Sequence, residues 1–350
     1  MKKRTFLKAL LATGSVVLVT DRFLPSRHST PGILQAPPSL EPQISPAPIL
    51  VETTAEEELQ LVMLQESELN PNYQHNERAV DQVRIQGSVQ NAQDVTDQLS
   101  EETVEGYLDK IRNFDANFAS DIHLNENNSA LLLPTLSRLD RVQSFVGFAN
   151  FNLIGFEEML YFARNYPDIG NFEKPELDFL DEIFNADATQ YGFFGEKVTP
   201  ELNHRIVQRD VEKIGGSGHY LLKGESLNHY LQIRKDIGQE LLLTSGIRNN
   251  VKQMHLFLAK AYQCDGNLSR ASRSLAPPGY SFHGSGDFDV GKSGLGEMNF
   301  TADLSHTDEF KRLINLGYVD IRYTDSNQYG VRYEPWHIKL ACDDHGHTCA

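Results

Sequence analysis

The chain has 350 residues, enough for one large domain or two small ones, and an apolar fraction of 40%, enough for a buried core. Its first 30 residues carry six Lys/Arg and one acid, whereas the whole chain carries 32 Lys/Arg and 48 Asp/Glu. The body after residue 30 is therefore strongly acidic and would repel phosphates, which argues against a nucleic-acid partner.

Residues 1–30 have the organisation of an export signal. A basic start at residues 2–4 precedes an apolar run at residues 9–19, which is shorter than the about 20 residues that a membrane-spanning helix needs. The basic start also resembles a twin-arginine export motif with lysine in the first position. We expect an exported protein of the periplasm or cell envelope, whose leader is either removed or kept as an N-terminal membrane anchor.

Residues 31–100 are predicted to be a weakly ordered linker. Six prolines fall within residues 31–50, a composition typical of an extended tether, and residues 51–100 are rich in Gln, Asn and Glu. From residue 101 onward apolar residues recur with helical spacing, so residues 101–235 are predicted to be mainly helical. The many aromatic residues of this region are expected to form a helical core rather than a cofactor pocket.

The rest of the chain is predicted to combine short strands with helices. Strands are expected at residues 240–244, 282–290, 318–323 and 331–340, and helices at residues 250–262 and 307–316. A helix-rich front and a strand-rich back indicate an α+β fold, in which a small antiparallel sheet carries the functional site and a helical extension precedes it. The expected regions are a signal at 1–30, a linker at 31–100, a helical region at 101–235, a core at 236–341 and a tail at 342–350.

Three cysteines leave two alternatives for the C-terminal tail. Cys342 and Cys349 can close a short disulfide loop, or the His-containing segment between them can bind a metal, and a clipped or disordered tail is the preferred interpretation. Cys264 is expected to be a small buried residue on or near a helix.

Two segments of the strand-rich part supply side chains that suit a catalytic zinc site. They contribute His283 with Asp289, and Glu334 with His337. Two imidazoles and a carboxylate make three ligands, while a second carboxylate can act as a base toward water at an open fourth position. Residues three apart on a regular strand point to opposite faces, so Glu334 and His337 can face one ion only if the strand bends or ends, which Pro335 favours.

These segments resemble the VanY-type zinc D-alanyl-D-alanine carboxypeptidases, within the LAS group of peptidoglycan peptidases. That family carries Ser-x-His-x-x-Gly-x-Ala-x-Asp, then Glu-x-x-His, and an upstream Ser-Gly-Tyr-Arg with a Gln five residues after the Arg. The chain has three such motifs in the same order over residues 239–340: Ser245-Gly-Ile-Arg248 with Gln253, Ser281-Phe-His-Gly-Ser-Gly-Asp-Phe-Asp289, and Glu334-Pro-Trp-His337.

The resemblance implies a fold, a cofactor and a set of roles. It implies that Zn²⁺ has three ligands, His283, Asp289 and His337. It implies that Glu334 is the general base and that Arg248 contacts the substrate carboxylate or the developing oxyanion. Two further residues are expected to help bind the substrate, Ser281 and Gln253.

Two departures from the family pattern bear on these roles. The spacing from His283 to the aspartate is one residue shorter than in the family, which makes Asp287 a rival ligand. Asp289 is preferred because its apolar neighbours match the end of the family motif. Ile247 stands where the family usually has Tyr, and this change is expected to alter a wall of the substrate pocket.

The expected function is zinc-dependent hydrolysis of peptidoglycan stem peptides, with release of C-terminal D-alanine as the leading reaction. The alternatives are an L,D-carboxypeptidase or a cross-link endopeptidase, and a non-catalytic cell-wall-binding module that keeps the metal fold. The helical region is expected to cover the cleft and narrow its specificity.

Two other features of the sequence receive plainer interpretations. Ser281 and His283 could be a serine nucleophile and its base, but two residues apart they need not hydrogen-bond, and the metal site uses both. The glycine-rich stretch at residues 215–218 lacks the Lys-Ser/Thr of a phosphate loop and is interpreted as a flexible turn.

Overall fold

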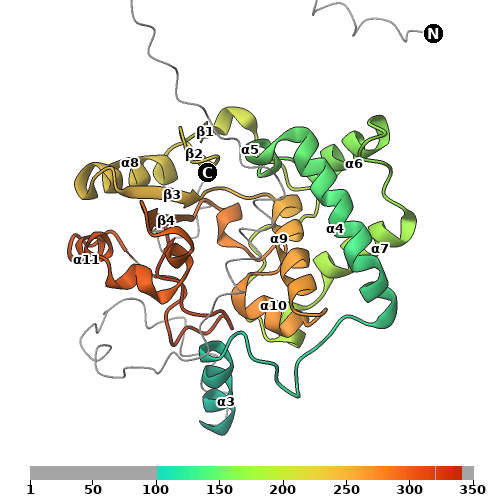
Figure 1. Ribbon diagram of the computed structural model, residues 1–350, viewed down its shortest axis with the longest axis horizontal. Coiled ribbons are helices and arrows are strands. Elements are labelled where there is room, and N and C mark those ends of the chain that lie inside the picture. Colours follow the sequence, from blue (N-terminus) through green and yellow to red (C-terminus); the bar gives the residue numbers. More distant parts are fainter. Residues whose placement is uncertain (1–100, 320, 341–350) are drawn as a thin grey trace, which may run out of the picture. The chain divides into compact units, whose positions relative to one another are not determined.

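The computed structural model describes residues 101–319 and 321–340 (Figure 1). The predictions for the export signal, the linker, the N-terminal anchor and the tail with Cys342 and Cys349 lie outside these residues. No helix within the described ranges is both long and apolar enough to span a membrane.

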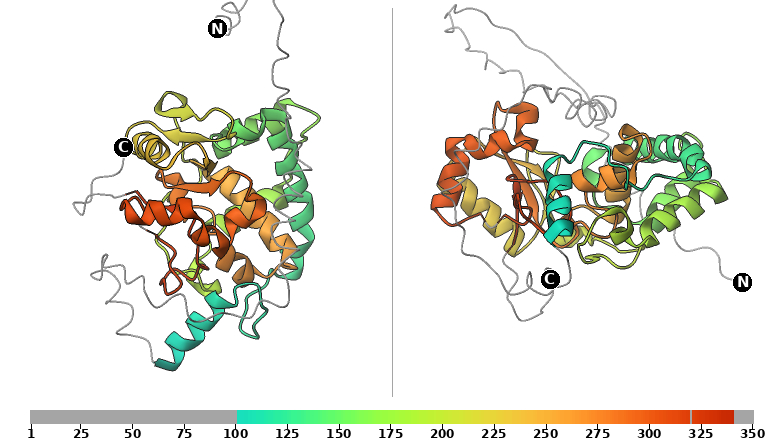
Figure 2. Two further views of the ribbon diagram at one scale, coloured as in Figure 1. Left: turned by 60° about the vertical axis from the view of Figure 1, so that its left-hand side comes forward. Right: turned by 90° about the horizontal axis from the view of Figure 1, so that it is seen from below.

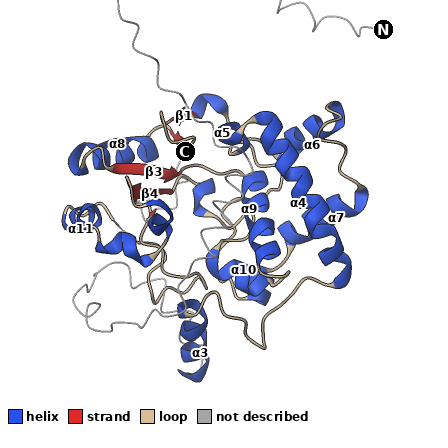
Figure 3. Cartoon of the chain, viewed as in Figure 1, coloured by secondary structure: helices blue, strands red, loops and turns tan. Residues whose placement is uncertain are grey.

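Helices form the first part of the described chain (Figure 3). They are α3 Glu101–Arg112, α4 Glu126–Val146, α5 Phe148–Phe151, α6 Phe156–Asn165 and α7 Lys174–Asn185. The longest, α4, begins where the Asn125 side chain accepts a hydrogen bond from the backbone of Asn128 at 2.9 Å, and it ends at Gly147, whose φ is 83°. The predicted helical extension is therefore present.

A short hairpin interrupts this helical part. The elements are the 3-10 turns η1 Ala188–Tyr191 and η2 Gln208–Asp210, then β1 Val211–Lys213 paired antiparallel with β2 Tyr220–Leu222. The hairpin lies within the region predicted to be mainly helical and was not foreseen, because three-residue strands are too short to produce a periodic pattern. The glycine-rich stretch forms the turn of the hairpin, with positive φ at Gly216 and Gly218, so its interpretation as a turn is confirmed.

The second part holds a three-stranded antiparallel sheet with the order β3-β4-β5. Its elements are α8 Glu225–Ile237, β3 Leu241–Ser245, α9 Asn250–Gln263, α10 Leu268–Ser274, η3 Phe282–Gly284, β4 Phe288–Lys292, η4 Gly296–Phe300, η5 Ala302–His306, α11 Asp308–Asn315 and β5 His337–Ile338. The α+β prediction is confirmed, and β3, α9 and α11 match their predicted positions closely.

The other predicted strands are largely wrong in extent. The chain makes a 3-10 turn at η3 before the strand β4 begins, since two glycines allow it to fold back there. Only His337 and Ile338 of the predicted strand at residues 331–340 pair as a strand. Among the described residues of the predicted strand at 318–323, only Ile321 forms a bridge, to Ile338.

Two main apolar cores hold these parts together. One lies among α4, α5, α6, α7, α9 and α10, and the other among α8, the sheet and α11. Helix α4 lies along α9 (Figure 2), so the helical extension packs directly on the helix that follows β3. Cys264 is buried at the end of α9 as a free thiol, as predicted.

The prediction that the aromatic side chains form a helical core is only partly confirmed. Phe151 is fully buried in the first core, whereas the side chains of Phe145 and Tyr161 are 43% and 54% exposed. The latter two lie on the outer faces of α4 and α6, where they border a groove that is described below.

Candidate metal centre

The sheet register brings two of the predicted ligands side by side. Asp289 on β4 is directly opposite His337 on β5, and Ser245 of β3 lies opposite Asp289 on the other side. Directly opposed residues of an antiparallel pair project to the same face, so the two side chains meet. Nδ1 of His337 lies 3.1 Å from Oδ1 of Asp289.

His283 reaches the same point from the turn η3. Its Nε2 lies 3.2 Å from Oδ2 of Asp289, and its Nδ1 lies 2.8 Å from the carbonyl oxygen of Gly246. Because a carbonyl can only accept, Nδ1 carries the hydrogen and Nε2 presents a lone pair to Asp289 and its surroundings. Gly246 is needed at this point, since a Cβ would lie 2.0 Å from the carbonyl oxygen of Tyr220.

The three side chains fit a divalent cation. Ligand atoms of His283, Asp289 and His337 all lie within 4.8 Å of one another, and the three residues are buried. We call them the metal cluster. Within the described part of the chain, His283 Nε2 and Asp289 Oδ1 are buried without a hydrogen-bond partner. Such orphaned polar atoms cost free energy unless something satisfies them, and nitrogen and carboxylate ligands at about 2.0–2.2 Å are what Zn²⁺ takes.

The charges of the metal cluster favour cation binding. Burial lowers the pKa of His283 to about 4, which keeps its ring neutral. Burial alone would raise the pKa of Asp289, but His283 and His337 hold it well below its usual range, so the carboxylate is ionised. Burial alone would lower the pKa of His337, but its contacts with Asp287 and Asp289 raise it to about 9. A bound cation must therefore displace a proton from His337.

Glu334 lies beside the metal cluster in a tight turn. The backbone N–H of His337 donates to the carbonyl of Glu334 at 3.2 Å, and Pro335 takes the second position of this turn. The strand β5 therefore begins only after this turn, so residues 334–337 do not form a regular strand, as Pro335 predicted. Glu334 is buried, and burial raises the pKa of its carboxyl to about 7, so it can exchange a proton near neutral pH.

Arg248 is positioned by the loop between β3 and α9. Its backbone N–H donates to the carbonyl of His283 at 3.3 Å, and its Nε has no hydrogen-bond partner among the described residues. Burial lowers the pKa of the guanidinium, while the charges of Asp289 and Glu334 act in the opposite direction. The loop therefore carries a partly buried cation, whose buried Nε is a free donor, in the field of both carboxylates.

The other residues that were predicted to bind the substrate make contacts within the protein itself. Ser281 is buried at the start of η3, where its carbonyl accepts from the backbone of Gly284 at 3.0 Å. Gln253 is buried in α9, and its amide nitrogen donates to the carbonyl of Ala276 at 2.6 Å, which fixes the segment that leads to Ser281. Ile247 packs in a small apolar cluster with Leu153, Val211 and Tyr220.

The rival carboxylate of Asp287 occupies a different place. It lies at the opposite edge of the His337 ring, with Oδ2 at 2.9 Å from Nε2 of His337. Arg322 donates from Nε to the same oxygen at 2.8 Å. The two aspartates thus flank His337, and only Asp289 shares the metal cluster.

Sequence reasoning missed three side chains around the metal cluster. Arg322 contacts Asp287, and the Tyr323 ring lies 5.0 Å from the His337 ring. The Nε of Arg332 lies 3.9 Å from Glu334, and its guanidinium lies 4.7 Å from the ring centroid of Phe114, in the helical extension. All three fell in predicted strands but outside every motif, so no local pattern marked them as part of a site.

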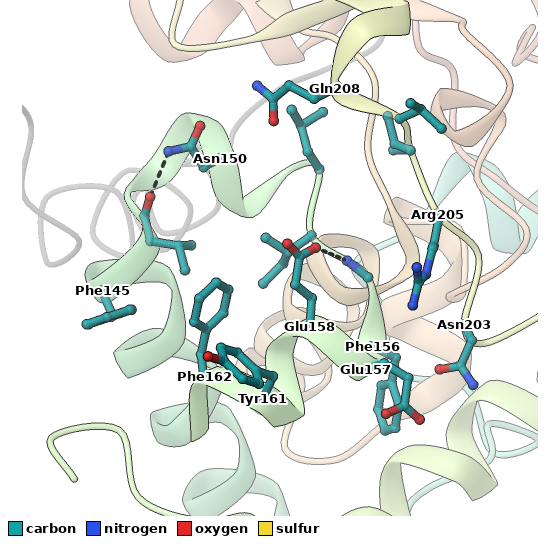
Figure 4. Close-up of a pocket in the computed structure, with 16 residues that line it drawn as sticks. Phe145, Asn150, Phe156, Glu157, Glu158, Tyr161, Phe162, Asn203, Arg205 and Gln208 are labelled. Carbon is teal, nitrogen blue, oxygen red and sulfur yellow. Dashed lines mark hydrogen bonds between the residues drawn. The ribbon is translucent and has the colours of Figure 1, made fainter. Parts of the chain in front are cut away.

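A cavity of about 970 Å³ lies away from these residues (Figure 4). It is bordered by α4, α6 and residues 203–208, and none of the predicted site residues line it. We call it the aromatic groove, after Phe145, Phe156, Tyr161 and Phe162. The side chain of Glu158 accepts from the backbone N–H of Gly155 at 3.4 Å at the start of α6, which is a helix-capping contact.

A family model matches the part of the chain that contains the metal cluster. Residues 224–342 match the VanY family, described as D-alanyl-D-alanine carboxypeptidase. No curated protein matches the chain.

Three solved structures are similar to parts of the chain. The LD-carboxypeptidase LdcB is 24% identical over 38% of this chain and 64% of its own, with a TM-score of 0.33, so the chain spans less than two thirds of LdcB. A mutant of the D,D-pentapeptidase VanY from a VanB-type vancomycin-resistance cassette, in complex with Zn(II), is 21% identical over 37% and 77%, with a TM-score of 0.30. VanYB in complex with D-alanine-D-alanine is 20% identical over 38% and 77%, with a TM-score of 0.31.

The family match covers about a third of the chain, from just before α8 to the end of the described residues and slightly beyond. It includes all three motifs that the sequence presented and every residue of the metal cluster. We call residues 224–342, which match the VanY family model, the VanY-type segment; in this chain a helical extension precedes it.

Proposed function

We propose that the protein is an exported zinc peptidase that releases C-terminal D-alanine from peptidoglycan stem peptides. The observation that carries the proposal is the metal cluster, with its orphaned His283 Nε2 and Asp289 Oδ1, inside a VanY-type segment. A buried carboxyl, Glu334, and a partly buried guanidinium, Arg248, accompany it.

The metal would be held by His283 through Nε2, by His337 through Nδ1 and by the carboxylate of Asp289. When bound, Zn²⁺ supplies Lewis acidity toward the scissile carbonyl and toward water. The carbonyl of Gly246 fixes the ring of His283, because it holds the hydrogen on Nδ1. The register of β4 and β5 fixes Asp289 beside His337.

Glu334 would act as the general base and then as the general acid. Its carboxylate takes a proton from the attacking water and passes it to the leaving amine of D-alanine. A carboxyl whose pKa lies close to the working pH can do both, since neither form is costly to reach. Burial raises the pKa of Glu334 to about 7, although nearby Arg332 acts in the opposite direction.

Arg248 would recognise the free terminus of the substrate. A guanidinium offers paired donors that match a carboxylate, and the Nε of Arg248 is buried with no partner in the described chain. The same group can stabilise negative charge that develops on the carbonyl oxygen during attack.

The decisive experiment compares three substrates with the zinc-loaded protein. We expect a stem pentapeptide that ends in D-alanyl-D-alanine to lose one D-alanine, measured by mass spectrometry. Cleavage of a tetrapeptide alone would identify an L,D-carboxypeptidase, and cleavage of cross-linked dimers alone an endopeptidase. Bound zinc with no cleavage of any substrate would identify a non-catalytic binding module.

A further inference from the structure

Asp287 lies at the centre of a buried set of contacts on the far side of His337 from the metal cluster. Its side chain is 3% exposed. Oδ2 accepts from Nε of Arg322 at 2.8 Å and lies 2.9 Å from Nε2 of His337, while Oδ1 accepts from the backbone N–H of Leu340 at 3.0 Å. Both oxygens of Asp287 thus already contact nitrogen atoms. Asp287 would have to lose some of these contacts in order to bind a metal.

These contacts determine which nitrogen of His337 faces the metal cluster. A neutral imidazole has one N–H and one lone pair. In the neutral ring that binds a cation, Nε2–H is donated to Asp287, so the lone pair of His337 lies on Nδ1, 3.1 Å from Asp289. His283 uses its two ring nitrogens the other way round: Nδ1 donates to the carbonyl of Gly246, and Nε2 faces the metal cluster. Each histidine is therefore held by an acceptor on the side away from the cluster.

Arg322 connects Asp287 to the segment that carries the other histidine. Its guanidinium carbon lies 3.5 Å from the centroid of the Phe282 ring, and Phe282 precedes His283 in the chain. The side chain of Arg322 is 9% exposed, so its contact with Asp287 is shielded from water. One buried arginine thus contacts both the residue before His283 and the acceptor of His337.

The turn at Gly286 and the register of the sheet explain how Asp287 reaches His337. Asp287 follows Gly286 directly, and Gly286 has a φ of 114°, so the chain reverses at this glycine before β4 begins. Asp287 and Asp289 are two residues apart, and His337 lies opposite Asp289 in the sheet. The two carboxylates consequently reach the two edges of one ring.

We propose that Asp287 is a positioning residue for the metal site and not a ligand: with Arg322 it fixes the orientation and tautomer of His337, and thereby raises the affinity for Zn²⁺. This inference rests on the metal site of the proposed function. It names a role for the residue by which this chain departs from the family motif.

The first test measures Zn²⁺ affinity of the full-length Asp287→Asn protein by competition with a chromophoric chelator. An amide keeps the volume but loses the charge that pairs with Arg322 and holds the N–H of His337. Loss of such an outer contact typically weakens metal binding by about 10- to 100-fold, and we expect a loss in this range. Affinity equal to that of the unmodified protein would overturn the inference. A loss as large as that of Asp289→Asn would make Asp287 a ligand, and would overturn it as well.

Asp121→Asn is the matched control. Asp121 is another buried aspartate paired with an arginine, since its Oδ1 lies 2.8 Å from Nη1 of Arg273 and its side chain is 1% exposed. It lies outside the metal cluster, in the helical extension. We expect this variant to keep its Zn²⁺ affinity. An equal loss in both variants would show a general effect of weakened folding and contradict the role of Asp287.

The second test reads the tautomer directly and does not require a folded variant. In the zinc-loaded protein labelled with ¹⁵N at histidine, long-range ¹H–¹⁵N spectra should show His337 protonated at Nε2 and His283 at Nδ1. His337 protonated at Nδ1 would overturn the inference even if zinc is bound. Failure of the unmodified protein to bind zinc would instead reject the metal site itself, and with it the proposed function.

Discussion

The metal cluster and the aromatic groove are opposites in shape and in chemistry. The groove has a volume of about 970 Å³ and exposed walls, of which the Tyr161 side chain is 54% exposed. The metal cluster is buried, and its orphaned atoms lie among charges that shift the pKa values of its members. The size of a cavity is a common guide to function, but here perturbed, buried titratable groups mark the chemistry instead.

The aromatic groove and the metal cluster also belong to different parts of the chain. The helical extension contains the groove and has an apolar core with aromatic side chains. The VanY-type segment contains the sheet, whose register determines which charged side chains meet. If this division is correct, substitutions in the metal cluster should affect metal binding and turnover, whereas substitutions in the groove should affect neither.

The largest effect is expected from His337→Ala. Removal of a ligand should weaken Zn²⁺ binding by more than the about 100-fold that is typical when only an outer contact is lost. Metal analysis after dialysis against a weak chelator measures this, and hydrolysis should disappear in parallel. His306→Ala is the control, because the side chain of His306 is 64% exposed on η5. Full zinc content in the His337 variant would reject the assignment of His337 as a ligand.

Glu334→Gln should separate metal binding from turnover. The amide fills the same space but cannot accept a proton from water, so hydrolysis should fall by about 100- to 10,000-fold, while the zinc content stays unchanged. Pentapeptide turnover in the zinc-replete variant is the measurement. Glu225→Gln, at an exposed position in the first turn of α8, serves as the control. Near-normal turnover of the Glu334 variant would exclude Glu334 as the base.

Arg248→Lys should have a smaller effect that depends on the substrate. Hydrogen bonds to charged groups contribute about 1.5–3 kcal/mol, so kcat/KM for a free C-terminal peptide should fall by about 10- to 100-fold while zinc remains bound. A C-terminally amidated peptide should be a poor substrate already and show a weaker effect of the substitution. Equal cleavage of the free and amidated peptides by the unmodified protein would contradict the carboxypeptidase proposal and favour an endopeptidase.

The sequence was sufficient to locate the metal cluster but not its surroundings. His283, Asp289, Glu334 and His337 lie in two short motifs at a turn and a strand end, where spacing alone restricts the geometry. Asp289 could be preferred over Asp287 as a ligand through its likeness to the family motif, but the contacts of Asp287 could not be predicted, since they depend on which residue of β5 lies opposite which residue of β4.

The same limit applies to the irregular segments. Ile321 joins the sheet through a single bridge, and β5 has only two residues, so no periodic pattern announces either. The contact of Arg322 with Asp287 joins residues 35 positions apart, and tertiary packing alone decides it. In the helical extension, periodicity predicted helices but not that Tyr161 would face outward.

The smallest effect is expected from Tyr161→Ala, in the aromatic groove. Tyr161 is more than half exposed, and its ring centroid lies 5.8 Å from that of Phe162. Exposed substitutions usually change stability by no more than about 0.5 kcal/mol, so the thermal unfolding midpoint should hardly move. Turnover of the short pentapeptide should change by less than about twofold, because about 0.4 kcal/mol corresponds to a factor of two.

A paired variant shows whether the groove is truly separate from the chemistry. Phe151→Ala removes a fully buried ring from the core of the helical extension, and such a change costs about 3–5 kcal/mol of stability. Below its lowered unfolding temperature, this variant should still bind zinc through the untouched metal cluster.

The comparison would fail if Tyr161→Ala lowered pentapeptide turnover tenfold with zinc still bound, since the groove would then contact the substrate. If Tyr161→Ala impaired only the digestion of intact peptidoglycan, the groove would bind the polymer at a distance from the metal cluster, because the chemistry on the short peptide would be unchanged.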